Sequence, residues 1–333
     1  MTTRQIPYLA IAPLRDAIKE YSKSYDNWGS DYTVTQLIRP PRIVQLEKRH
    51  QEYFDNLPFT EDTLTKQLKS FKGTAIHSWF ERMLWKYINS HPNCGYMQEK
   101  RIWDRICDRK ISGKFDCFRN GALYDWKTTS VWKRIFGQLD DYENQLNLYA
   151  YLLGTCGVKV TALFIIAWYM DWDKFKIYQK DYPPKEIEQI HIRNLWTPDQ
   201  QKRYLFDLIE AQKKNETLPD DQLDKCKPED MWEKETQYAV TYPTANRAVR
   251  VLDTMAQAKQ YIVDAKARAK KDTTKAVPTN LANYFVETRG GDRTRCSAYC
   301  KANCFCNQYA AYCTRSGREV VHAKEITTEE GVG

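Results

Sequence analysis

The chain lacks the long apolar runs that membrane-spanning proteins require. No stretch of 18 or more apolar residues occurs, and no segment near the start has the pattern of an export signal. Internal repeats and low-complexity tracts are also missing, which excludes solenoid and fibrous architectures. We therefore expect a soluble, cytoplasmic protein whose 333 residues form one large or two modest domains.

Charge of neither sign is in large excess. The 51 Lys and Arg residues against 43 Asp and Glu residues give a net charge of +8. This value is too small for a histone-like protein that binds DNA through its overall charge, but it is compatible with a local basic channel for nucleic acid. One basic run has two equally weighted interpretations, a solvated helix face or a surface for nucleic acid, and it consists of Lys266, Arg268, Lys270, Lys271 and Lys275.

The order of apolar segments predicts an α/β fold, with a mixed central sheet flanked by helices and with helical additions at both ends. Residues 1–70 form an N-terminal helical extension, in which Thr33 caps a short helix that stops at Pro40–Pro41. Residues 71–182 form the core, with a helix, three antiparallel strands and a second helix. Two further strands follow over 160–168 and 174–180, and Pro183–Pro184 ends the sheet.

Residues 183–333 form a C-terminal region of helices and a hairpin. The pattern predicts a helix over 197–214, a small hairpin over 238–252 and a basic amphipathic helix over 254–271.

The most informative segment is a hairpin centred on Asn120–Gly121, the dipeptide that most strongly favours a two-residue turn. Such a turn sets the register, so Arg119 pairs with Ala122 and Asp116 falls opposite Asp125. Directly opposed like charges destabilise a sheet. The conflict disappears when a divalent cation lies between the carboxylates, since Mg²⁺ and Mn²⁺ prefer carboxylates, waters and phosphate oxygens as ligands.

Strand alternation places Lys127 on the same face as Asp125, and Trp126 on the other. An ammonium beside a metal-bound phosphate can hold the attacking water or offset the charge that develops on phosphorus. The pattern therefore indicates metal-dependent phosphodiester hydrolysis. The alternative interpretation is a solvated cross-strand ion pair without a catalytic role.

Two predicted helices supply further candidates. His77 follows Gly73 and shares a helix face with Phe80 and Leu84, so it is either a core histidine or an imidazole ligand that points at the aspartates. In the second helix, Gln145 and Tyr149 stand four residues apart and hence on one face. Their side chains suit contacts with DNA phosphates and sugars, although ordinary helix surface is the alternative.

In order and spacing these residues resemble the PD-(D/E)XK nucleases, in particular the RecB-like branch that includes the nucleases of CRISPR adaptation and many phage exonucleases. That family has Gly-x-x-His, then Gly-x-x-Asp, then (Asp/Glu)-x-Lys, then Gln-x-x-x-Tyr. The matching residues here are Gly73 and His77, with one extra residue between them, Gly113 and Asp116, Asp125 and Lys127, and Gln145 and Tyr149.

The resemblance implies a restriction-endonuclease-like core with an Mg²⁺ or Mn²⁺ site. It assigns metal binding to His77, Asp116, Asp125 and the carbonyl of Trp126, with Glu99 as a weaker candidate near a metal-bound water. Lys127 would position the nucleophilic water, while Gln145 and Tyr149 would contact DNA. Trp132 is a candidate for stacking on a splayed base, and packing is the equal alternative.

The same resemblance implies that the partner is DNA, single or double stranded and acted on at its ends. Recombination, repair or processing of phage DNA would be the setting, inside a host cell, with a helicase or a single-strand annealing protein as a further partner. Two rival functions remain, a catalytically degenerate DNA-binding protein of the same fold and an interaction module whose cysteines bind metal.

Ten cysteines without an export signal point to metal ligands or buried thiols rather than to disulfides. Five lie in the short segment 296–313, and such thiolate density suits Zn²⁺ or an iron–sulfur cluster. Cys226 resembles the first cysteine that precedes a C-terminal triplet in related phage nucleases. The predicted ligands of a structural [4Fe-4S] cluster or Zn²⁺ are thus Cys226, Cys296, Cys300 and Cys306.

Other cysteines have other expected roles. Cys304 and Cys313 are substitutes for one of the predicted ligands. The remaining four are expected to be buried thiols, and they are Cys94, Cys107, Cys117 and Cys156. The predicted cluster would tie the C-terminal segment onto its domain.

Overall fold

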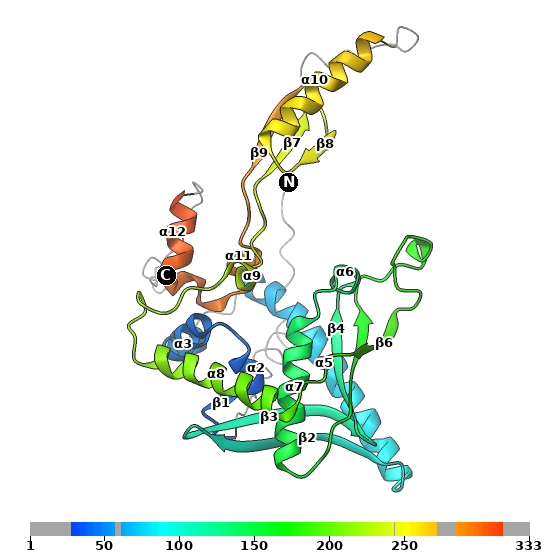
Figure 1. Cartoon of the computed structure of the whole chain (residues 1–333), viewed down its shortest axis with the longest axis vertical. Coiled ribbons are helices and arrows are strands. Elements are labelled where there is room, and N and C mark those ends of the chain that lie inside the picture. The colour runs from blue at the N-terminus through cyan, green and yellow to red at the C-terminus, as the bar shows by residue number, and fades with distance from the viewer. Residues whose placement is uncertain (1–27, 57–60, 243, 272–283, 316–333) are drawn as a thin grey trace, which may run out of the picture. The chain divides into compact units, whose positions relative to one another are not determined.

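The computed structural model describes residues 28–56, 61–242, 244–271 and 284–315 (Figure 1). Side chains are not described over 61–70, at 99 and over 266–271. The chain divides into two compact units: unit 1 comprises Met1–Pro41 and Glu52–Thr217, and unit 2 comprises Arg42–Gln51 and Leu218–Gly333. The core unit therefore extends beyond residue 182, where the sequence placed its end.

Unit 1 is built on a mixed sheet in the order β1-β3-β4-β5-β6, with β2 paired to the other edge of β3. The pairs β1–β3 and β4–β5 are parallel, and the other pairs are antiparallel. The predicted α/β class with a mixed central sheet is confirmed. The strands are β1 (Tyr32–Thr33), β2 (Tyr96–Ile106), β3 (Arg109–Arg119), β4 (Ala122–Thr129), β5 (Ala162–Tyr169) and β6 (Ile187–Ile192).

The hairpin between β3 and β4 forms as predicted. Asn120 and Gly121 have φ of +49° and +87°, the left-handed values that a type I′ turn requires at both central residues. The register pairs Arg119 with Ala122, Phe118 with Leu123 and Cys117 with Tyr124. The ladder ends there, while all of β4 continues to pair with β5.

Helices cover both faces of this sheet (Figure 1). On one face, the Phe80 ring of α5 (Glu61–Ser90) stacks on Trp126 of β4 at 5.2 Å between centroids. On the opposite face, α7 (Asp140–Thr155) packs against β2 to β5 and buries Leu146, Leu152 and Leu153. The smaller helices of the unit are α2 (Val34–Leu37), α4 (Gln51–Asn56), α6 (Val131–Ile135) and the 3₁₀ turn η1 (Lys174–Lys176).

The start of α5 and the last strand differ from the prediction. The helix begins at Glu61 rather than at Gly73. Residues 174–180 do not form a strand, because the Asp173 side chain accepts a hydrogen bond from Phe175 N and starts the 3₁₀ turn instead. The last strand is β6, which follows Pro183–Pro184, so these prolines precede the edge strand rather than end the sheet.

Other predicted helices lie where they were expected. Thr33 caps α2 through a capping box with Gln36. Thr197 caps α8 (Pro198–Glu216) in the same way, with Gln200 as its partner. Among the described residues, no helix is both long and apolar enough to cross a membrane.

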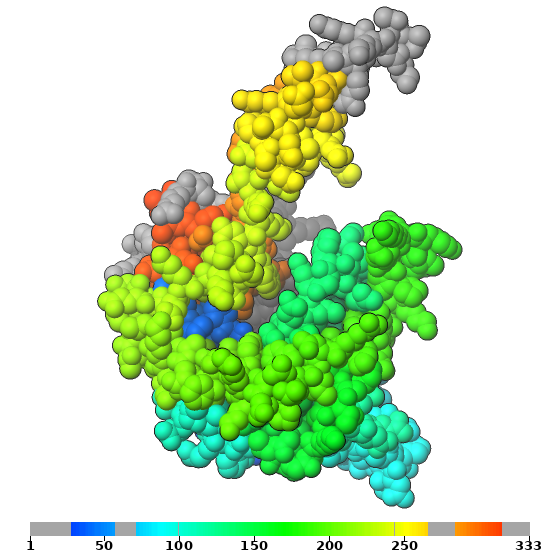
Figure 2. Space-filling view, viewed as in Figure 1, coloured from blue at the N-terminus to red at the C-terminus, as the bar shows by residue number. Residues whose placement is uncertain are grey.

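Unit 2 combines short helices with a small sheet. The predicted hairpin is present as β7 (Gln237–Thr241) and β8 (Arg250–Leu252), and β9 (Phe285–Arg289) adds a third antiparallel strand. The helix α10 (Met255–Lys271) packs against all three strands, and together they form the yellow lobe in Figure 2. The predicted basic run falls outside the described side chains. The remaining elements are α3 (Pro41–Arg49), α9 (Pro228–Met231), α11 (Thr294–Ala298), η3 (Lys301–Phe305) and α12 (Asn307–Arg315).

Candidate metal-dependent nuclease site

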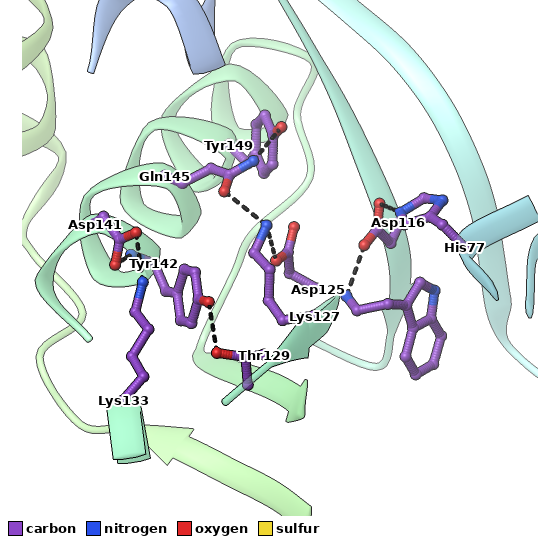
Figure 3. A network of polar contacts seen from close by, with 11 residues as sticks. His77, Asp116, Asp125, Lys127, Thr129, Lys133, Asp141, Tyr142, Gln145 and Tyr149 are labelled. Carbon is purple, nitrogen blue, oxygen red and sulfur yellow. Dashed lines mark hydrogen bonds and ion pairs between the residues drawn. The ribbon is translucent and has the colours of Figure 1, made fainter. Parts of the chain in front are cut away.

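A single cleft of about 220 Å³ in unit 1 contains every residue that the sequence proposed for the carboxylate site. Figure 3 shows how their side chains converge from α5, β3, β4 and α7. The predicted residues that line the cleft are His77, Asp116, Asp125, Trp126, Lys127, Gln145 and Tyr149.

The cleft lies where strand pairing along one edge of β3 is interrupted. On that edge, β1 pairs with Ile111 and Ser112, and β4 pairs only from Cys117 onward. The predicted direct pairing of Asp116 with Asp125 is therefore not formed. Instead, Asp116 Oδ2 accepts a hydrogen bond of 2.6 Å from the backbone N–H of Trp126, so the carboxylate itself joins the two diverging strands.

The other oxygen of Asp116 faces α5. His77 Nε2 lies 2.8 Å from Asp116 Oδ1, and the aspartate is 5% exposed. Burial lowers the pKa of His77, but the hydrogen bond to Asp116 and the charges of Asp116 and Asp125 outweigh it, so the net shift is upward. Gly73 permits the close approach of α5, because a Cβ there would lie 2.9 Å from Thr128 Oγ1 of β4.

Asp125 is the most strongly perturbed carboxylate of the cleft. It is 2% exposed, and its Oδ2 lies 2.6 Å from Lys127 Nζ. The contact is an ion pair by distance, yet Oδ2 has no hydrogen bond of ordinary geometry. Burial raises the pKa of Asp125 to about 6, with Asp116 adding to the rise and Lys127 opposing it. The buried oxygen is thus under-satisfied as it stands.

A chain of hydrogen bonds fixes Lys127. Its Nζ donates to Gln145 Oε1 at 2.9 Å, and Gln145 Nε2 donates to the Tyr149 hydroxyl at 2.8 Å (Figure 3). The Tyr142 ring lies 5.3 Å from the same ammonium. Gln145 and Tyr149 are 7% and 4% exposed, so in this arrangement they orient the lysine from within the protein.

The charges of Asp116 and Asp125 favour the protonated form of Lys127. Burial lowers the pKa of Lys127, but the charges of Asp125 and Asp116 outweigh it and raise the pKa overall. Lys127 therefore stays protonated in the cleft at neutral pH.

The donor atoms suit a hard divalent cation. Two carboxylates and an imidazole converge, and the Trp126 carbonyl lies on the open strand edge because a residue's N–H and C=O point to the same side of a strand. His77 Nε2 and Asp116 Oδ1, 2.8 Å apart, are about as far from each other as two neighbouring ligands of one ion with bonds of about 2.0–2.2 Å, although here they are joined by a hydrogen bond. Among the described residues, no group of three or more His, Cys, Asp or Glu is already arranged as a metal site.

Besides the motif glycine Gly113, five residues that were not proposed from the sequence also line the cleft. They are Arg101 of β2, Lys114 of β3, and Thr33, Val34 and Thr35 at the start of α2. Lys114 could have been predicted from the sequence, because it lies two residues before Asp116 and hence on the same face of the strand. The others come from separate elements, and no sequence pattern connects them.

Two weaker candidates remain from the sequence. Trp132 is 48% exposed and stacks on Phe136, and it is not among the lining residues. The side chain of Glu99 lies outside those described.

In unit 2, a second pocket contains the four cysteines proposed as ligands. It encloses about 20 Å³, the space of a single water or ion. Burial, with the neighbouring cysteines of the group adding to the effect, raises the pKa of Cys226 and of Cys296 to about 12 each. The thiols lining the pocket are Cys226, Cys296, Cys300 and Cys306.

Helix α3, distant in sequence, supplies one wall of this cysteine pocket. Ile43 packs with Cys226 and Met231, and Cys296 and Cys300 pack against that cluster. Arg42 is 2% exposed and donates hydrogen bonds to Leu223 O, to Asp224 O at 3.0 Å and to Asn307 Oδ1 at 2.6 Å. Arg42 of α3 is therefore hydrogen-bonded to two parts of the chain, residues 223–224 and Asn307, that lie on either side of the pocket. This role of α3 was not predicted from the sequence.

The other cysteines lie away from this pocket. Cys304 and Cys313, the proposed substitutes, do not line it. Cys117 is buried as predicted, and Cys94 and Cys107 are partly buried. Cys156 is exposed, contrary to the prediction, because it follows the end of α7 in a surface turn.

Comparisons with known proteins indicate only distant similarity. No family model matches the chain, and no curated protein matches it. Among solved structures, it is similar to the crystal structure of SSO0001, with 18% identity and a TM-score of 0.41 over 61% of this chain and 87% of that one. It is also similar to a protein named "Putative exonuclease" from Eubacterium rectale, with 14% identity and a TM-score of 0.35 over 67% of this chain and 90% of that one.

Proposed function

We propose that this protein is a divalent-metal-dependent deoxyribonuclease. The observation that carries the proposal is one cleft in which two buried carboxylates, Asp116 and Asp125, meet the ammonium of Lys127. Asp125 is 2% exposed, and burial and the neighbouring Asp116 raise its pKa although Lys127 lies 2.6 Å away. A bound cation would offset the free-energy cost of keeping two buried carboxylates ionised.

Asp116, Asp125, His77 and the Trp126 carbonyl would hold Mg²⁺ or Mn²⁺. When bound, such an ion would polarise the phosphodiester and acidify a water molecule. His77 would have to bind the ion through a neutral nitrogen, so its hydrogen bond to Asp116 would be exchanged for a bond to the ion. The protein thus contributes two carboxylates, an imidazole and a backbone carbonyl as ligands.

Lys127 is the residue proposed to act on the reacting groups. Its ammonium remains charged in the cleft, and Gln145 and Tyr149 hold it in one direction. A fixed cation beside the phosphate stabilises negative charge that develops during attack, and it can also hold the attacking water by a hydrogen bond. A preorganised donor of this kind typically contributes a factor of about 10²–10³ to the rate.

The finer proposal is an exonuclease that degrades DNA from its ends. It rests on the resemblance in motif order described above. A setting in recombination, repair or phage DNA processing, with a helicase or single-strand annealing protein as partner, belongs to the same proposal.

The test incubates purified protein with end-labelled linear DNA and closed circular DNA, single and double stranded. Each substrate is tested in Mg²⁺, in Mn²⁺ and in EDTA, with the Lys127→Ala variant in parallel. Lys133→Ala is a matched control, because Lys133 also contacts the Tyr142 ring but pairs with Asp141 at 2.7 Å, outside the cleft.

We expect divalent-dependent loss of linear DNA that is abolished in Lys127→Ala and retained in Lys133→Ala. Survival of closed circles would mark the activity as end-dependent, and loss of circles would refute the exonuclease assignment. DNA binding without cleavage in any metal would instead identify the catalytically degenerate DNA-binding protein.

We further propose that the four cysteines of unit 2 hold a structural [4Fe-4S] cluster or Zn²⁺. Burial raises the pKa of Cys226 and of Cys296 to about 12, so these two thiols stay protonated at neutral pH, and binding of a metal would deprotonate them and link the segment at Cys226 to α11. Metal analysis and the visible absorption of an iron–sulfur cluster distinguish the two cofactors. A melting temperature that is insensitive to a strong chelator would contradict the structural role. Metal binding without any effect on DNA would favour the interaction-module alternative.

A further inference from the structure

The cleft has a basic end that the proposed chemistry does not use. Arg101 and Lys114 line it together with the hydroxyl-bearing residues Thr33 and Thr35. The two basic residues are directly paired across β2 and β3, so their side chains emerge on the same face of the sheet. A cation pair therefore lies in the same cavity as the carboxylates.

The spacing between this pair and the metal-binding end is set by the strand. Lys114 and Asp116 are two residues apart on β3, a rise of roughly 6.6 Å along the same face. Consecutive phosphates of a nucleic-acid strand are separated by a comparable distance. A strand whose scissile phosphate lies at Asp116 can thus bring its neighbouring phosphate to Lys114 and Arg101.

A hydrogen bond to the strand β3 fixes the position of the Arg101 side chain. Arg101 Nη1 donates a hydrogen bond of 3.0 Å to Ser112 Oγ, and Ser112 is fully buried. A guanidinium has five N–H donors in a planar fork, so this bond anchors the group and leaves others for a phosphate. The exposed Thr35 lines the same cleft, and its hydroxyl suits a phosphate oxygen, whereas the buried Thr33 hydroxyl, 3.0 Å from it, caps α2.

We propose that Arg101 and Lys114 bind the phosphate adjacent to the scissile one. This inference rests on the proposed nuclease function and specifies its substrate class: a nucleic-acid strand with at least two consecutive charged phosphates in the cleft, rather than an isolated phosphodiester. Recognition is electrostatic and reads no base, so it favours no sequence.

The experiment removes either the positive charge of Arg101 or Lys114 or the negative charge of one phosphate in the DNA. Single-turnover cleavage is followed at one defined linkage of a synthetic oligonucleotide. The linkage on its 5′ side or its 3′ side is replaced in turn by an uncharged methylphosphonate. Proteins compared are the unmodified chain, Arg101→Ala, Lys114→Ala, the double variant and Lys100→Ala. Lys100 is the matched control, because it is exposed on β2 and paired with Phe115, on the opposite face.

In the unmodified protein, we expect a neutral linkage on one side to slow cleavage at least tenfold. The double variant should be slow on fully charged DNA yet lose that tenfold sensitivity, since the protein charge and the substrate charge act through one contact. The salt dependence of DNA binding should also weaken, by about one unit in the log–log slope for each lost contact. Lys100→Ala should behave like the unmodified protein.

A structural effect is separated from phosphate binding by Arg101→Lys, which retains the charge and should keep the sensitivity to neutral linkages. Lys114→Ala removes only an exposed side chain and does not threaten the fold. An unmodified protein that tolerates a neutral linkage on both sides, or a double variant with undiminished sensitivity, overturns the proposal. Absence of cleavage in every metal is a different result, because it contradicts the nuclease function itself.

Discussion

The clearest test of the site's electrostatics is the pH dependence of stability in Asp125→Asn. Asp125 is buried, and its pKa is raised from 3.8 to about 6. At 1.36 kcal/mol per unit, this shift corresponds to roughly 3 kcal/mol. A carboxyl whose folded-state pKa is raised destabilises the protein when it is ionised. The penalty is absent below about pH 4 and fully present above about pH 6.

We therefore expect unit 1 of the metal-free protein to lose about 3 kcal/mol of unfolding free energy between pH 4 and pH 7 in excess of what Asp125→Asn loses. His77 adds a loss of the same sign in both proteins, because its raised pKa favours the folded state only while it is protonated. The difference between the two proteins reports Asp125 together with its coupling to Lys127, Asp116 and His77.

Urea unfolding followed by tryptophan fluorescence is the assay. Every tryptophan except Trp232 belongs to unit 1, so the signal reports the unit that contains the cleft. Addition of Mg²⁺ should recover the lost stability of the unmodified protein at pH 7 and leave Asp125→Asn largely unchanged. Parallel pH profiles for the two proteins, without the extra loss, would refute the idea that a desolvated carboxylate awaits a cation here.

Three further substitutions test separate contacts. Gly73→Ala should shift α5 and weaken metal binding about tenfold by titration calorimetry, and Thr128→Ala should restore it by removing the atom 2.9 Å from the new Cβ. Tyr149→Phe removes a hydrogen bond worth about 1 kcal/mol and should lower kcat roughly tenfold while KM changes little. Cys226→Ser should lower the metal content and the melting temperature of unit 2, whereas Cys304→Ser, outside the cysteine pocket, should alter neither.

The β3–β4 hairpin was predicted from its turn alone over three residue pairs. The Asn120–Gly121 turn predicts these pairs correctly, because turn geometry sets the register next to a two-residue loop. The same rule failed one pair further on, at Asp116 and Asp125. Pairing there depends on β1, which occupies the same edge of β3 from a remote part of the chain, and on the bond from Trp126 N to Asp116.

Two other misses have similar causes. Residues 174–180 contain apolar and aromatic side chains that favour a strand, but the capping bond of Asp173 and the pairing of β6 with β5 decide the outcome. The role of α3 beside the cysteines depends on contacts between residues some 180 positions apart, such as Arg42 with Asp224. Sequence periodicity identifies a helix face but does not identify its partner.

The interrupted ladder also explains why the cleft is where it is. If β4 paired with β3 along its whole length, the Trp126 N–H would bond to a backbone carbonyl and Asp116 would have no reason to turn inward. Because β3 and β4 diverge, the Asp116 carboxylate takes the hydrogen bond from Trp126 N that a backbone carbonyl of β3 would otherwise accept. The unpaired strand edge faces the cleft, toward α7 and β1. The gap thus brings the aspartates, the lysine and the basic pair into one cavity, which adjacent and fully paired strands would keep closed. His77 lies 2.8 Å from Asp116 and Lys127 lies 2.6 Å from Asp125, so each carboxylate of the cavity has a basic partner within the protein. A metal ion and a phosphate that bind there would rearrange these two contacts.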